Sequence, residues 1–201
     1  MFPEDPKARS DFTAGALYAI WGVGDWIYYG QMAADKSVGF FARRDREIAG
    51  TAEVLASPIM SRVTVSFPSV GRALRAGVWK KLGKYPLRDE LAGDQPVVLW
   101  SWGTTLDVTV WIGRVQSLVT RVEDPSIQDF EVMSVWDAIE HIPDRLAMDY
   151  APDEASTLAN AWSIGGPVWR QRCVKEEFAR RFPDNRAHQL PADWVPARRM
   201  V

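Results

Sequence analysis

The sequence predicts an α+β fold, with an antiparallel, partly barrel-like β-sheet in the N-terminal two-thirds and helices after it. Two observations support this class. Apolar residues alternate in short runs between Gly, Asp and Pro turns up to residue 122, and beyond it they recur at helical spacing. Strands grouped before helices are typical of α+β proteins, and strands joined by short turns can curl into a barrel. We therefore expect a β-rich domain over residues 1–122 and a helical extension over residues 123–201, packed as one unit.

The stretch over residues 15–45 shows the sheet pattern most clearly. Aromatic and β-branched residues fill residues 17–21, 26–32 and 37–43, and polar turns separate these runs. Such runs between Gly and Asp turns predict a meander of three strands. The other strands are expected to add to this sheet.

Later runs predict further strands and two short connections. The strands are recognised by alternation or by β-branched residues between turn signals. They cover residues 58–66, 78–82, 96–102 and 106–112, with 114–122 as one more candidate. Residues 45–56 form a short helix or an irregular connection, and residues 68–77 form a short helical turn.

Helical patterns begin after residue 123. Asp124-Pro125-Ser126 is a helix-start signal, because Asp or Ser caps a helix and Pro is tolerated in its first turn. Apolar residues then recur every three positions, which predicts a helix that Pro143 ends; the alternative is a strand over residues 130–135 leading into a shorter helix. The stripe consists of Ile127, Phe130, Met133, Trp136, Ile139 and Ile142. Further helices are expected over residues 153–162 and 167–182.

Composition is that of an ordinary soluble protein. The 201 residues are 47% hydrophobic and 25% charged, which allows a sizeable core. The single cysteine, Cys173, excludes an internal disulfide framework and a Cys-based zinc site. The polar N-terminus does not read as a signal peptide, and no apolar run approaches the roughly 18 residues that cross a bilayer. We expect a cytoplasmic protein with no membrane partner.

Charge is distributed unevenly, although the net charge is only −2. Residues 62–88 hold seven basic residues and no acidic one, whereas residues 123–154 hold ten acidic residues and one Arg. Such blocks form solvated faces or complement each other within the fold; the alternative is a surface that faces a partner. Because the net charge is slightly negative and no nucleic-acid-binding motif is present, we do not expect nucleic acid as a partner.

Catalytic and metal-binding motifs are missing from the sequence. Neither HxxxH nor CxxC spacing occurs, and there is no P-loop, GxGxxG or GxSxG. His141 reads as a helix C-terminal residue favoured by the macrodipole, with a general base or metal ligand as the alternative, and His188 lies in a polar tail. Cys173 reads as a packing residue. We predict a protein that is not an enzyme and needs no cofactor or metal; an acid pair acting with His141 is the catalytic alternative.

Ten Trp residues suggest an aromatic binding surface. Trp100 and Trp102 alternate on one strand and should share a face, and Trp111 lies on the facing strand. Together they could form a platform on which sugars or bases stack. This makes a carbohydrate- or nucleotide-binding module the alternative function. The simpler interpretation is a sheet face packed under the C-terminal helices.

The helix predicted after Asp124 carries acidic residues away from its apolar stripe or along its flanks. Asp129, Glu131, Asp137 and Glu140 would form an exposed carboxylate face. Such a face attracts a basic partner and raises the rate of association. These four residues are the candidate partner-binding site.

Five short motifs follow one another along the first half of the chain. They are Gly15-Ala16-Leu17-Tyr18-Ala19-Ile20, Tyr29-Gly30-Gln31, Val38-Gly39-Phe40-Phe41, Pro58-Ile59-Met60 and Trp79-Lys80-Lys81-Leu82-Gly83. In order and spacing they resemble the immunity protein 26 family of bacterial polymorphic-toxin systems, over roughly residues 15–112. The resemblance implies a small, soluble, non-catalytic protein that binds a cognate toxin domain, with a nuclease as one candidate, and blocks it. It assigns no catalytic residues and leaves the oligomeric state open.

Overall fold

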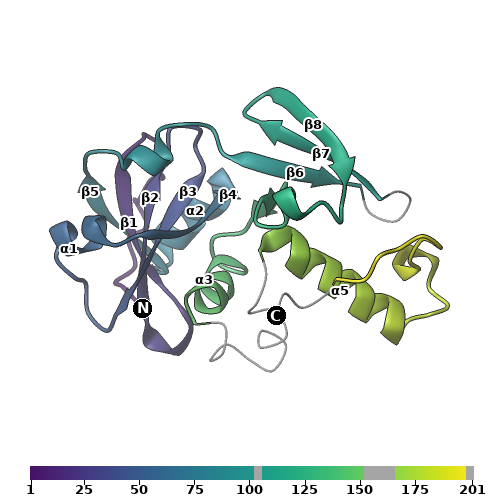
Figure 1. The fold of residues 1–201 in the computed structure, drawn as a ribbon. Helices are drawn as coiled ribbons and strands as arrows, with labels where there is room; N and C mark the ends of the chain where they lie inside the picture. Colours follow the sequence, from purple (N-terminus) through teal and green to yellow (C-terminus); the bar gives the residue numbers. More distant parts are fainter. Residues whose placement is uncertain (102–105, 152–165, 198–201) are drawn as a thin grey trace. The chain divides into compact units, whose positions relative to one another are not determined.

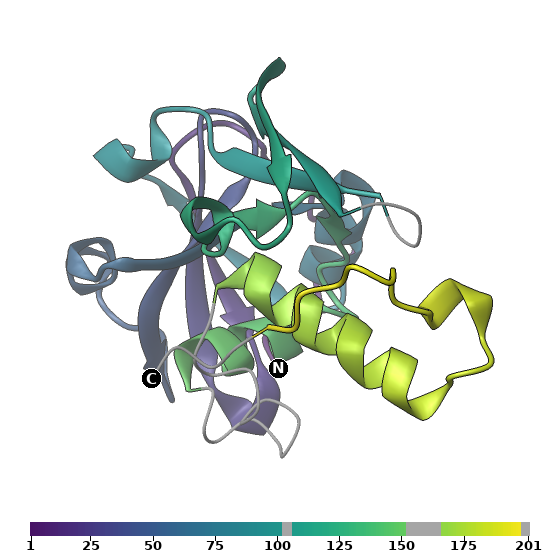
Figure 2. The same cartoon turned by 45° about the vertical axis from the view of Figure 1, so that its right-hand side comes forward.

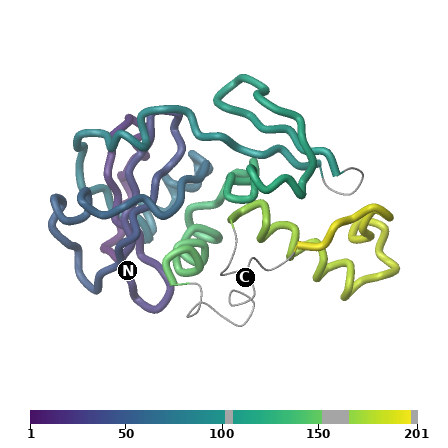
Figure 3. Tube along the Cα trace, viewed as in Figure 1, coloured from purple at the N-terminus to yellow at the C-terminus, as the bar shows by residue number. Residues whose placement is uncertain are grey.

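The computed structural model describes residues 1–101, 106–151 and 166–197. Its combination of a mostly antiparallel sheet with helices is the predicted α+β class (Figure 1). The chain forms two compact units that interleave along the sequence: residues 1–94 and 134–160 make unit 1, and residues 95–133 and 161–201 make unit 2. Figure 3 follows the chain from unit 1 into unit 2 and back. The boundary expected after residue 122 falls inside unit 2.

Unit 1 is built on a curled six-stranded sheet with the order β10-β4-β3-β2-β1-β5. Neighbouring strands are antiparallel, except that the short β10 runs parallel to β4. The strands are β1 Ala16–Trp21, β2 Ile27–Met32, β3 Val38–Asp45, β4 Ile59–Val65, β5 Trp79–Lys84 and β10 Val135–Trp136. The predicted meander and the predicted strands over residues 58–66 and 78–82 are therefore confirmed.

β1 is apolar along its length because both faces of the sheet are covered. Tyr18 and Ile20 lie in a core with residues of helices α2 and α3, whereas Leu17 and Ala19 lie in a second core with a residue of α1. Burial of a side chain such as Leu17 or Ile20 contributes about 1.5–3 kcal/mol. The helical elements are α1 Thr51–Ala56, α2 Phe67–Arg75 and α3 Ile142–Tyr150, with 3-10 turns η1 Val23–Asp25 and η2 Asp89–Leu91.

The long helix predicted from the apolar stripe is wrong. The chain instead makes a 3-10 turn, η3 (Pro125–Ile127), then the two-residue strands β9 (Glu131–Val132) and β10, and only then α3. Pro143 lies in the first turn of α3, where its missing N–H has no partner to lose, so it starts the helix that follows. The stripe is divided between two cores, with Ile127 in unit 2 and Ile142 in unit 1. The alternative of a strand followed by a shorter helix is closer to the structure.

Unit 2 contains a four-stranded sheet with the order β8-β7-β6-β9, in which β9 is parallel to β6 and the other pairs are antiparallel. Helix α5, the long yellow-green helix in Figure 2, supplies Val168 to the same apolar core as Val98 and Val108 of the sheet. The elements are β6 Pro96–Trp100, β7 Asp107–Ile112, β8 Val115–Arg121, α5 Pro167–Arg181 and the 3-10 turn η4 Arg186–His188. These strands and this helix were predicted. The helix expected over residues 153–162 lies outside the described residues.

Candidate binding surface

Trp100 and Trp111, the two members of the predicted aromatic platform that the structure describes, do not form it. Trp111 of β7 is paired with Val97 of β6, so these two side chains share a face. Trp100 is three positions after Val97 on β6 and points to the other face. Trp100 and Trp111 therefore lie on opposite faces of the sheet. Trp100 is 6% exposed and stacks on Trp194, with ring centroids 6.0 Å apart. Trp102 lies outside the described residues. The face that carries Trp100 is a packed core face.

Two cations on α5 lie under this core face. The Nζ of Lys175 is 5.3 Å from the ring centroid of Trp100 and 5.7 Å from that of Trp194. Arg172 donates to Gln128 Oε1 (3.2 Å) and to the Val195 carbonyl (2.7 Å). Burial lowers the pKa of the Arg172 guanidinium and of the Lys175 ammonium. Sequence reasoning missed both groups, although their spacing from Val168 places all three on one face of the helix.

The four candidate acids do not share a helix face. Asp129 is exposed and Glu131 is 7% exposed on β9, both in unit 2, whereas Asp137 and Glu140 belong to unit 1. Glu140 is exposed, but Asp137 is engaged within its own unit: it accepts from the N–H groups of residues 139 and 140 and pairs with Arg72 at 2.6 Å. The predicted carboxylate face is therefore corrected to two exposed acids, Asp129 and Glu140, one in each unit.

The pKa of Asp137 reflects this local engagement. Burial alone would raise the pKa, but hydrogen bonds from the backbone and the charges of Arg72 and His141 lower it below its usual range. The carboxylate thus acts as a fixed acceptor that closes the turn before α3. The turn is also tied to β5 and to α2, because the Trp79 indole N–H donates to the Ala138 carbonyl (3.1 Å) and the Ala138 N–H donates to Ser69 Oγ (2.9 Å).

The two histidines make local contacts. His141 is the exposed N-cap residue of α3, so the predicted position at a helix C-terminus is wrong, and its Nδ1 accepts from the Asp137 N–H (3.2 Å). Its ring meets that of Trp136 edge to face. His188 in η4 stacks on Phe178, with ring centroids 5.0 Å apart. Cys173 is half-buried in α5.

Much of the basic block is paired with carboxylates inside unit 1. Arg72 pairs with Asp137 of the acidic block, and this ion pair links the two charge blocks directly. The other pairs join basic residues to acids outside the acidic block: Arg62–Asp35 at 2.8 Å, Lys81–Asp11 at 2.6 Å and Arg88–Glu90 at 2.7 Å. The expected complementarity of the two blocks is thus seen at Arg72 and Asp137, whereas Arg62, Lys81 and Arg88 are paired with other acids of unit 1, so these four basic residues do not form a free cationic patch.

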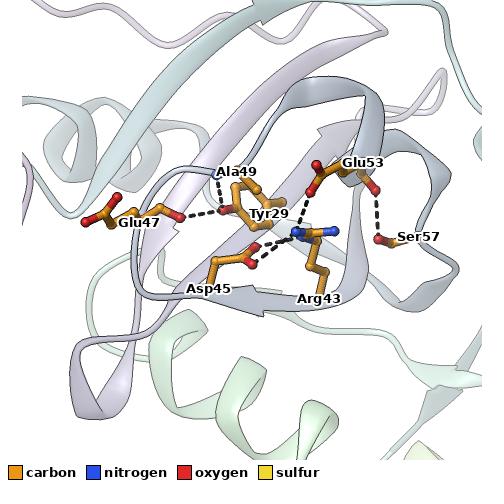
Figure 4. A network of polar contacts seen from close by, with 7 residues as sticks. All are labelled: Tyr29, Arg43, Asp45, Glu47, Ala49, Glu53 and Ser57. Carbon is orange, nitrogen blue, oxygen red and sulfur yellow. Dashed lines mark hydrogen bonds and ion pairs between the residues drawn. The ribbon is translucent and has the colours of Figure 1, made fainter.

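A polar network fixes the chain between β3 and α1 (Figure 4). Arg43 pairs with Asp45 (2.7 Å) and Glu53 (2.7 Å). The hydroxyl of Tyr29 accepts from the Ala49 N–H (2.9 Å), and burial raises its pKa to about 12. The network holds the connection between two elements of the fold.

β8 exposes apolar side chains along its length. Val115, Leu118 and Val119 are 67%, 43% and 57% exposed. β8 is the outer strand of its sheet, and in the described part of the chain no backbone hydrogen bond outside the pairing with β7 involves residues 115–120. The N–H and C=O groups on its outer side are therefore open to solvent. The sequence predicts a strand here but does not show that it lies at an edge.

No family model, no curated protein and no solved structure matches the chain. Across the ranges that the structure describes, no group of three or more His, Cys, Asp or Glu side chains is placed to hold a metal ion. No helix within those ranges is both long and apolar enough to cross a bilayer.

Proposed function

We propose that the chain is a non-catalytic immunity protein, which binds a cognate toxin domain and neutralises it in the cytoplasm of the toxin-producing cell. The observation that carries the proposal is that all five family-like motifs contribute residues to one sheet. They fall in and around β1, β2, β3, β4 and β5, with side chains such as Tyr18, Phe40 and Trp79 in its core. A shared order of strand motifs supports a shared scaffold, because each motif supplies a strand to the same sheet.

The second motif illustrates how these residues serve the scaffold. Gln31 is fully buried; its Nε2 donates to the Pro86 carbonyl (2.9 Å) and its Oε1 accepts from the Arg88 N–H (3.3 Å). At Gly30 a Cβ would lie 2.8 Å from side-chain atoms of Val38 and Phe40. The motif thus joins β2 to β3 and to the loop after β5, and it leaves the exposed surface free to vary with the partner.

The contact with a basic toxin, such as a nuclease, is proposed for the exposed acids. Of the four candidates, Asp129 and Glu140 are exposed, whereas Glu131 is buried and Asp137 is paired. Exposed carboxylates steer a cationic partner and act mainly on the association rate. Asp129 would contribute to toxin binding from unit 2, and Glu140 from unit 1.

The immunity function requires that a neighbouring gene encodes the toxin, so the test is growth of bacteria that express that neighbouring gene, with and without the chain. Protection is expected from the parent, and the lack of it would refute the immunity function. Asp129→Lys or Glu140→Lys should slow association about threefold or more. Asp184→Lys and Asp94→Lys, exposed acids in units 2 and 1, are the matched controls. If both test variants bind as fast as the parent, the acidic contact is wrong although the function can stand.

A further inference from the structure

The outer strands of the two sheets differ in how they discourage pairing. β5, at the edge of the unit 1 sheet, carries Lys80, Lys81 and Lys84. β8, at the edge of the unit 2 sheet, carries no Lys, Pro or acid, and its one charge, Arg121, is at its last position. Charged residues on an edge strand, Lys above all, protect it from other strands. β8 therefore combines open backbone groups with apolar side chains and lacks that protection.

The two ends of β8 differ in charge. Arg114 lies exposed in the turn between β7 and β8, next to Gly113, whose φ of 60° forms that turn. At the other end Arg121 is opposite Asp107 on β7 and pairs with Glu123 (3.1 Å) and Asp193 (3.5 Å). Three carboxylates around one guanidinium make this end acidic, whereas the turn end is basic.

We propose that β8 pairs antiparallel with β8 of a second copy of the chain, about a two-fold axis near Leu118. Residues equally distant from such an axis lie opposite each other, so Arg114 of one copy faces Val122 of the other. Its guanidinium then lies beside the acidic end that contains Glu123. A parallel arrangement would bring like ends together. Charge therefore selects the antiparallel pair. Leu118 lies at its centre, and Val119 next to it faces Ser117 of the other copy.

The pairing closes the assembly at two copies. In an isologous two-fold contact the β8 edge of each copy is covered by the β8 edge of the other. The opposite edge of the same sheet is β9, which has only two residues. A contact made mainly by one strand from each copy is smaller than a standard protein interface. We expect a dissociation constant in the micromolar range. The association does not depend on toxin binding.

Sedimentation over about 1 to 300 µM tests the proposal, with a concentration-dependent shift from a 22.7 kDa monomer to a dimer as the expected result. Leu118→Lys should weaken the dimer about tenfold or more, because it places two like charges at the axis. Leu99→Lys is the matched control: Leu99 is 41% exposed but lies on β6, which β7 separates from β8. Arg114→Glu should weaken the dimer and reverse its sensitivity to salt. Circular dichroism checks that each variant is folded.

A cysteine trap tests the register. In a Cys173→Ser background, Leu118→Cys should form an intermolecular disulfide on mild oxidation, because cross-strand neighbours at a two-fold axis have Cβ atoms about 5 Å apart. Leu99→Cys should not. The proposal is overturned if the parent stays monomeric throughout the range, if the dimer survives both Leu118→Lys and Arg114→Glu unchanged, or if the two cysteines cross-link equally.

Discussion

Replacing Gln31 by Met tests whether one buried carboxamide holds the loop after β5 to the sheet. Gln31 is fully buried; its side chain donates to the Pro86 carbonyl (2.9 Å) and accepts from the Arg88 N–H (3.3 Å). It also makes a longer hydrogen bond to the Gly15 carbonyl (3.5 Å), which keeps a second donor in the Tyr85 N–H. Met has a similar length and volume, so the change removes these hydrogen bonds without opening a large cavity; the Pro86 carbonyl and the Arg88 N–H are the two groups left without this partner.

The expected cost follows from the two backbone groups that lose their partner. The loop is partly exposed, so water can replace part of each hydrogen bond, and each loss should cost about 1 kcal/mol. The free energy of unfolding should therefore fall by about 2 kcal/mol. For a chain of this length the Tm would fall by about 4 to 8 °C.

Urea unfolding gives the free energy, and amide hydrogen exchange in β1 and β2 shows whether the loss is local to that sheet. Gln116→Met is the matched control, because Gln116 is exposed on β8, and it should change stability by less than about 0.5 kcal/mol. If Gln31→Met costs no more than this control, the carboxamide does not hold the loop and the reasoning is refuted.

Three further changes test other parts of unit 1. Asp35 pairs with Arg62, and although burial raises its pKa, hydrogen bonds lower it overall. Its stabilisation is therefore present above pH about 4 and lost as pH falls through the lowered pKa, and Asp35→Asn should flatten that part of the pH profile of urea unfolding. Gly77 has φ +70°, so Gly77→Ala should cost at least about 1 kcal/mol by calorimetry; an unchanged Tm would contradict the strain. Tyr29→Phe should cost about 1 kcal/mol and speed amide exchange at Ala49; unchanged exchange would contradict the anchoring role.

The strands β1 to β8 were predictable because alternation and turn residues are local signals, whereas the two-residue strands β9 and β10 fall in the segment predicted as a helix. The structure of that segment was not predictable, because a period of three also arises when a segment crosses from one core to another. Ile127 packs in unit 2 and Ile142 in unit 1, and an apolar pattern does not show which core receives each residue. In the sequence, Pro143 could either end the helix before it or begin the helix after it. Only the packing of α3 decides that Pro143 lies in the first turn of a new helix.

The candidate site was harder to predict because it depends on register. A shift of one residue in the pairing of β6 and β7 would move Trp100 and Trp111 from opposite faces to the same face. Side-chain alternation within each strand does not determine this register. Exposure of the acids depends on tertiary contacts in the same way: Arg72, far away in sequence, engages Asp137 and leaves Glu140 in solvent.

The interleaving of the two units matters for synthesis on the ribosome. β4 ends at Val65, but its parallel neighbour β10 is made only at Val135 and Trp136, after the whole of β6 to β9. At about 5–20 residues per second, β4 waits several seconds for this neighbour. During that time the core also lacks Ile142 and Leu146 of α3. A nascent chain stopped after residue 122 would therefore leave the first unit unfinished, and an expression fragment cut there would share this defect.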